Sequence, residues 1–115
     1  MLNEAKLTAA GIDIPSGIKR FSGDEQAYER ALRSYLRDSN FDTLTHALER
    51  GDSEAAVSAT HALQAFGASL AMTELYLASK ALNEKLRARA GLNECQACFE
   101  AVKAAHCKAV AALTE

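Results

Sequence analysis

Apolar residues recur at intervals of three and four along most of the chain, which is the spacing of helices with one buried face. The sequence has no alternating strand pattern and no Asn-Gly or Asp-Gly hairpin signal. Short connections between the last helices favour an antiparallel arrangement. The predicted fold class is all-α, an antiparallel four-helix bundle with additional short N-terminal helices. The predicted helices cover about 2–10, 14–22, 23–38, 40–51, 52–72, 73–91 and 93–115.

Residues with capping chemistry stand where several of these helices begin. Asp13 precedes the second short helix, and Pro15 stands near its first turn. Ser22 and Glu25 fit a capping box, which predicts Ser22 as the N-cap of the third helix. Asp52 is the predicted cap of the helix that follows Gly51.

Composition agrees with a small folded helical domain. The chain has 115 residues and 12.3 kDa, so we expect a single domain over residues 1–115. Apolar residues make up 49% and charged residues 24%, which indicates a folded chain rather than a disordered one. Alanine is abundant, and the one proline is Pro15, which favours helix over strand.

Charge and hydropathy exclude several classes of function. The net charge is −2 with basic residues scattered, whereas a nucleic-acid binder needs a basic patch. No apolar run approaches the roughly 18–20 residues of a membrane span, and the first residues resemble no signal peptide. Three cysteines indicate reduced thiols. We therefore expect a cytoplasmic protein that binds neither nucleic acid nor membrane.

The helix predicted over 52–72 has one histidine opposite its buried side. With about 100° per residue, one apolar stripe lies within roughly 40° of Leu63. His61 falls about 160° from Leu63, so its imidazole should be in water. The other members of the stripe are Ala56, Ala59, Phe66, Gly67 and Leu70.

The residues around His61 are unusually small and uncharged for a solvent face. They are Val57, Ser58, Gln64, Ala65 and Ala68. A flat surface of this kind around a projecting imidazole suits docking by another protein. The alternative is an alanine-rich helix whose surface histidine is incidental.

An exposed imidazole without catalytic neighbours has few possible roles. Near neutral pH much of it is uncharged and nucleophilic. The spacing offers it no Ser–His–Asp or Cys–His partner. One role needs few helpers, which is to hold a phosphoryl group as a phosphoramidate while a partner supplies the metal and acidic groups.

The segment from His61 to Met72 resembles the core motif of histidine phosphotransfer (HPt) domains, His-x-Leu-Lys-Gly followed by small residues and Leu-Gly. Flanking segments also resemble this family, and together they cover most of the chain. Upstream these are Gly11-Ile12-Asp13, Ile18, Phe21-Ser22-Gly23-Asp24, Tyr28, Leu32, 47–52, Ala56, Ala59 and Thr60; downstream they are Leu75, Ala78, Leu82 and Leu86.

The resemblance implies a four-helix-bundle phosphocarrier with no kinase activity of its own. His61 matches the phosphorylated histidine, which accepts a phosphoryl group from a receiver-domain aspartate and passes it to another receiver. The implied partners are response-regulator receivers and a hybrid sensor kinase. The domain would bind no cofactor or metal, because Mg²⁺ belongs to the receiver. The expected docking residues are Gln64, Ala65, Ala68, Val57 and Ser58.

The sequence departs from the family pattern near the histidine. Gln64 stands where the family usually has lysine, and Ala65 and Ala71 stand where it usually has glycine. A neutral donor interacts with a phosphoryl oxygen about half as strongly as a charged one. These departures support a second hypothesis, a degenerate HPt-like module that binds receivers without efficient transfer.

Other candidates are better explained as packing or surface residues. Cys95 and Cys98 form a Cys-x-x-Cys pair, but Cys95 and His106 should be roughly 16 Å apart along one helix, too far to share a metal. We expect Cys95 and His106 in or beside the core, and His46 on the surface. Cations that adjacent helices can bring toward His61 are Lys80, Arg30, Arg33 and Arg37, although solvated surface charge is the better explanation for them.

Overall fold

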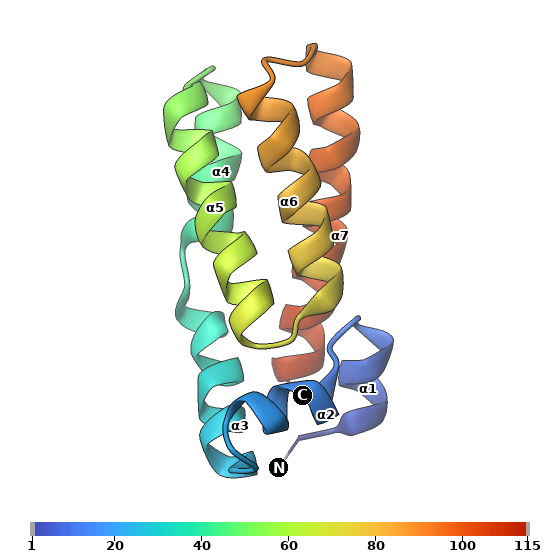
Figure 1. Ribbon diagram of the computed structural model, residues 1–115. Coiled ribbons are helices and arrows are strands. Elements are labelled where there is room, and N and C mark those ends of the chain that lie inside the picture. The colour runs from blue at the N-terminus through green and yellow to red at the C-terminus, as the bar shows by residue number, and fades with distance from the viewer. Residues whose placement is uncertain (1, 115) are drawn as a thin grey trace.

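The computed structural model describes residues 2–114, without the side chain of Leu92, and it contains only helices and their connections in that range (Figure 1). The all-α prediction is therefore confirmed. The elements are α1 (Glu4–Ala9), α2 (Ile14–Arg20), α3 (Glu25–Ser34), the 3-10 turn η1 (Tyr35–Arg37), α4 (Asn40–Glu49), α5 (Ser53–Ser69), α6 (Thr73–Arg87) and α7 (Leu92–Thr114).

Aspartates cap α2, α3 and α5. The predicted caps Asp13 and Asp52 are confirmed, since their side chains accept from the amides of Ser16 and Ala55. The prediction for Ser22 is wrong, because Asp24 caps α3 instead and accepts from the amide of Ala27 at 3.0 Å.

Ser22 belongs to the end of α2 rather than to the start of α3. Its φ of 56° lies in the left-handed region, which closes a helix. The next amide, from Gly23, donates to the carbonyl of Ile18 at 2.9 Å. A serine in this conformation cannot also act as the extended N-cap of the following helix.

Three helices end earlier than the sequence pattern predicts. The third helix stops at Ser34 rather than near residue 38, and η1 continues it. The fifth and sixth stop at Ser69 and Arg87 rather than near residues 72 and 91, and each is followed by a residue at φ 56°, Ala71 or Arg89. The left-handed region favours glycine, so neither non-glycine residue signalled these ends in the sequence.

Helices α4, α5, α6 and α7 lie side by side, with α5, α6 and α7 antiparallel to their chain neighbours (Figure 1). Helix α3 and η1 lie below α4 on the same side, and α1 and α2 pack across the end where α7 finishes. Stacked rings join distant elements, since Phe41 of α4 lies 4.2 Å from His106 of α7 by ring centroids.

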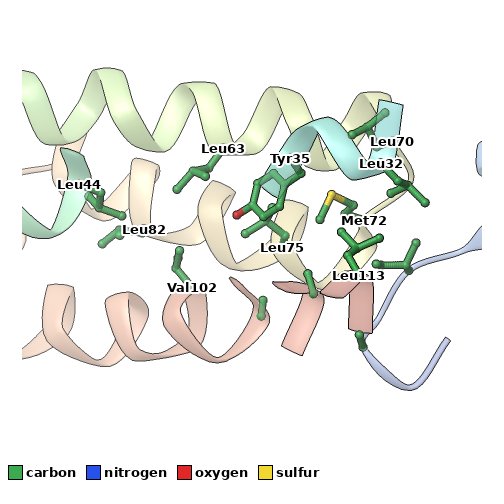
Figure 2. Close-up of a cluster of buried hydrophobic side chains, with 14 of the residues drawn as sticks. Leu32, Tyr35, Leu44, Leu63, Leu70, Met72, Leu75, Leu82, Val102 and Leu113 are labelled. Carbon is green, nitrogen blue, oxygen red and sulfur yellow. The ribbon is translucent and has the colours of Figure 1, made fainter. Parts of the chain in front are cut away.

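The interior is apolar and continuous along these helices. Figure 2 shows Leu44 and Leu63 pointing toward Leu82 and Val102, so that α4, α5, α6 and α7 share one core. Among the apolar side chains the Tyr28 hydroxyl donates to the carbonyl of Leu70 at 2.7 Å. Burial raises the pKa of Tyr28 to about 12, so this hydroxyl keeps its proton.

Candidate functional site

Helix α5 buries one side and exposes the opposite side, as its sequence predicts. Ala56, Ala59, Leu63, Gly67 and Leu70 are buried, which confirms these members of the stripe. The remaining member, Phe66, is partly buried against the core. The stripe fixes the rotation of α5 about its axis.

His61 is exposed near the middle of α5, as predicted. It makes no hydrogen bond or ion pair with any residue in the described range 2–114. Both of its ring nitrogens are therefore available to a molecule arriving from solvent.

The five residues predicted to surround His61 are not equally accessible. Ser58, Ala65 and Ala68 are exposed, so the surface beside the imidazole carries short side chains. Val57 and Gln64 are only half-buried. On α5 itself, the side chains next to His61 are therefore short or partly buried, and none of these five is charged.

A buried polar network lies directly under this surface, and it was not predicted from the sequence. Thr60 is fully buried and Asn83 nearly so. Asn83 Nδ2 donates to Thr60 Oγ1 at 2.8 Å and to the Val57 carbonyl at 3.1 Å. Arg87 Nε in turn donates to Asn83 Oδ1 at 2.9 Å. This network ties α6 to the turn of α5 that precedes His61.

The two helices also meet closely at Gly67. A Cβ atom built there would lie 2.7 Å from both the backbone nitrogen and the Cα of Tyr76. Only glycine permits this approach of α5 to α6 without displacing backbone. Gly67 and Thr60 thus mark two points where α5 touches α6.

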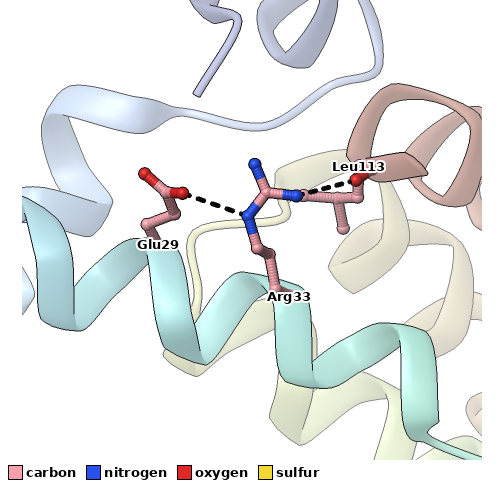
Figure 3. A network of polar contacts seen from close by, with 3 residues as sticks. All are labelled: Glu29, Arg33 and Leu113. Atoms are coloured by element: carbon pink, nitrogen blue, oxygen red, sulfur yellow. Dashed lines mark hydrogen bonds and ion pairs between the residues drawn. The ribbon is translucent and has the colours of Figure 1, made fainter. Parts of the chain in front are cut away.

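Two of the arginines that could bring charge toward His61, Arg33 and Arg30, lie at the end of the molecule where α7 finishes. Arg33 Nε lies 3.1 Å from Glu29 Oε2, and Arg33 Nη1 donates to the carbonyl of Leu113 near the end of α7 (Figure 3). Arg30 lines a cavity beside Leu2 and Ile14 at the same end of the molecule. Arg37 is exposed in η1.

A second cavity, of about 820 Å³, lies at the opposite end of the helices, and His61 does not line it. Its walls come from the turn between α4 and α5 and from the turn between α6 and α7, with Val57, Arg87 and Cys95 among them. The candidate site is therefore a surface around His61 rather than a pocket.

The remaining histidines and the cysteine pair lie where packing predicts. His46 is exposed on α4, as expected. Cys95 is buried and Cys98 half-buried, and neither is in a disulfide. His106 is half-buried, stacked on Phe41, with its Nδ1 2.6 Å from the Tyr35 hydroxyl.

The position of His106 predicts a pH-dependent stability. Burial lowers the pKa of His106 below its ordinary value of 6.5, although Asp42 and Asp38 oppose the shift. The unfolded chain therefore takes up this proton first, and stability falls as pH drops below about 6.5. We expect the midpoint of urea unfolding to decrease between about pH 7.5 and 5.5, and the decrease to shrink in His106→Gln. Equal decreases in the two proteins would contradict this assignment.

In residues 2–114 no group of three or more His, Cys, Asp or Glu side chains is placed to hold a metal ion. Over the same range, none of the helices combines the length and the apolar character needed to cross a bilayer.

Comparison with known proteins leaves the site to be interpreted from its own residues. No protein-family model, curated protein or solved structure matches the chain.

The arrangement limits what His61 can do chemically. In the described part of the chain the ring has no general base, nucleophile or carboxylate bonded to it, so it does not belong to a catalytic triad there. It is an accessible nucleophile on a rigid helix, backed by a buried network and surrounded by small side chains. Such a group suits reaction with an electrophile that another molecule carries and activates.

Proposed function

We propose that this chain is a histidine phosphocarrier of the HPt type. His61 accepts a phosphoryl group from a receiver-domain aspartate and passes it to another receiver in a multistep phosphorelay. The observation that carries the proposal is the exposed imidazole of His61 at the centre of α5, which bonds to no residue of the described range 2–114 and lies opposite the buried stripe.

The transfer step needs little from this chain beyond position. A lone pair of an His61 ring nitrogen attacks the phosphorus of the aspartyl phosphate. The bond between phosphorus and the carboxylate oxygen breaks, and the carboxylate leaves with the electron pair. The second transfer is the reverse reaction on another aspartate. In both directions the receiver supplies Mg²⁺ and the charged groups that stabilise the transferring phosphoryl group.

The surface around His61 is suited to the approach of a receiver domain. Ser58, Ala65 and Ala68 are short and exposed, so a receiver can bring its aspartate close to the imidazole. Gln64 and Val57 beside them are half-buried. We propose that α3 with α4 forms one column and that α5, α6 and α7 form the others of an HPt four-helix bundle.

The remaining properties follow from this role. The chain acts without kinase activity, cofactor or metal of its own, and its partners are response-regulator receivers and a hybrid sensor kinase. The proposed location is the cytoplasm, where these partners meet it. Neither nucleic acid nor membrane is a proposed partner.

A second candidate function is favoured by Gln64. A neutral amide stands where the HPt pattern has a lysine, which weakens the expected contact with a phosphoryl oxygen. A module of this kind would bind receivers and sequester them without efficient transfer.

One experiment separates the two candidates. The protein is mixed with a panel of purified receiver domains that have been charged with radiolabelled acetyl phosphate in the presence of Mg²⁺. We expect label to move onto the protein as an acid-labile, alkali-stable phosphoramidate, because the His61 imidazole is free to attack the aspartyl phosphate.

Binding is measured in parallel by size-exclusion chromatography. A stable complex without label on the protein selects the sequestering module. Neither label nor complex with any receiver would refute both candidates and leave His61 as an incidental surface residue.

A further inference from the structure

The seam between α5 and α6 has a defined register, which places the neighbours of His61 on α6. Thr60 contacts Asn83 through a 2.8 Å hydrogen bond, and Gly67 contacts Tyr76. From the first pair to the second, the contact moves seven residues forward along α5 and seven residues back along α6, as expected for two antiparallel helices. Residues 61 and 82 therefore lie level across the seam, as do residues 63 and 80.

Lys80 lies on the edge of α6 that faces α5. Tyr76, Lys80, Asn83 and Arg87 fall within roughly 60° of one another around the helix, at spacings of four and three residues. Tyr76 and Asn83 touch α5 directly, and Lys80 lies between them along the helix axis. Lys80 is exposed, so its side chain leaves the seam on the solvent side.

His61 follows Thr60 by one residue, so it lies about 100° around α5 from the contact with α6, on the solvent side of the seam. Like Lys80, it is exposed. The level of Lys80 is about 3 Å from that of His61 along the axes, at 1.5 Å per residue. Packed helices are about 8–10 Å apart, a distance that a lysine stem and a projecting imidazole can bridge together.

Lys80 is also uncommitted. It makes no hydrogen bond or ion pair with any residue of the described chain, including Glu84 one turn away. Arg87 differs, because its Nε is held by Asn83 and it lines the cavity at the far end. Arg87 is also about 7.5 Å farther along the axis than the level of His61.

We propose that Lys80 is the phosphoryl-contacting cation of this chain and takes the part that a lysine at position 64 would play. The inference rests on the proposed function. In phosphorylated His61, the Lys80 ammonium donates a hydrogen bond across the seam to a phosphoryl oxygen. A charge-assisted bond of this kind replaces the neutral donor that Gln64 offers.

The test uses phosphoramidate as the donor, so no receiver is needed. An imidazole lone pair attacks phosphorus, the P–N bond of the donor breaks, and ammonia leaves with the electron pair. The initial rate at His61 is compared with the rate at His46 in the same molecule by mass spectrometry of peptides. His46 is exposed on α4 and serves as an internal reference.

We expect Lys80→Ala to lower the ratio of the His61 rate to the His46 rate by about fivefold to tenfold, the difference between a charged and a neutral hydrogen bond. Lys80→Arg should keep the ratio within about twofold, because the charge remains. Gln64→Lys in the Lys80→Ala background should restore it. The matched control is Lys103→Ala, an exposed lysine of α7, which should leave the ratio unchanged.

The dependence of the rate ratio on salt concentration distinguishes a charge contact by Lys80 from a purely structural role of this residue. The wild-type ratio should fall as salt rises, because exposed charges are screened, whereas the Lys80→Ala ratio should be flat. An unchanged ratio in Lys80→Ala overturns the assignment of Lys80 and leaves His61 as the phosphorylated residue. Reaction at His46 with none at His61 overturns the proposed function as well.

Discussion

Replacing Gly67 with alanine is expected to destabilise the protein by about 2–3 kcal/mol and to lower its Tm by about 10 °C. The added methyl group would lie 2.7 Å from backbone atoms of Tyr76, closer than carbon atoms pack. Backbone cannot rotate away as a side chain can, so α6 must move from α5. The better helix propensity of alanine offsets only about 1 kcal/mol of this cost.

Gly91→Ala is the matched control. Gly91 lies between α6 and α7, and a Cβ atom there meets nothing within 4 Å. Urea and thermal unfolding should show this variant within about 0.5 kcal/mol of wild type. If Gly67→Ala unfolds at the wild-type midpoint, α5 and α6 do not approach each other as closely as the structure shows.

Replacing His61 with glutamine is expected to reduce labelling by charged receivers to background. Glutamine is similar in length and polarity, but its amide nitrogen has no free lone pair with which to attack phosphorus. Because His61 is exposed and bonded to nothing in the described chain, its replacement should change the free energy of unfolding by less than about 0.5 kcal/mol. Loss of label with unchanged stability separates chemistry from folding.

His46→Gln provides the comparison for this experiment. It removes another exposed imidazole, that of α4, outside the surface that we propose for docking. Receivers should label this variant at the wild-type rate. Label that persists in His61→Gln and disappears in His46→Gln would move the acceptor site to α4.

The rotation of α5 could be predicted from the sequence because one strong signal sets it. Apolar residues on one side of the helix, from Ala56 to Leu70, fix which side is buried, and the position of His61 follows by geometry. The all-helical architecture could also be predicted from the sequence, since the capping aspartates Asp13 and Asp52 each bond to an amide only three residues away.

Contacts between helices were harder to predict from the sequence. Thr60 lies next to His61 in the sequence and outside the apolar stripe, so periodicity does not predict its burial. It is nevertheless buried, where Asn83 of α6 donates a hydrogen bond to it. The pairing of α5 with α6 depends on register, which hydrophobic periodicity does not specify. The same gap explains why Lys80 and three arginines could not be ranked as neighbours of His61 from the sequence.

Local sequence signals also mispredicted helix boundaries at residues that can either end one helix or begin the next. Ser22 and Glu25 satisfy the spacing of a capping box, but the left-handed conformation of Ser22 closes α2 first. Ala71 behaves similarly, since an alanine at φ 56° gives no sign that α5 has ended.

The most direct test of the relay is the passage of label between two receivers through this chain. One receiver is charged with radiolabelled acetyl phosphate and freed from the donor, then mixed with a second, uncharged receiver and Mg²⁺. With the wild-type protein added, label should reach the second receiver through a transient phosphoprotein. With His61→Gln added, it should not. Label that reaches the second receiver equally fast with either protein would contradict the assignment of His61 as the carrier.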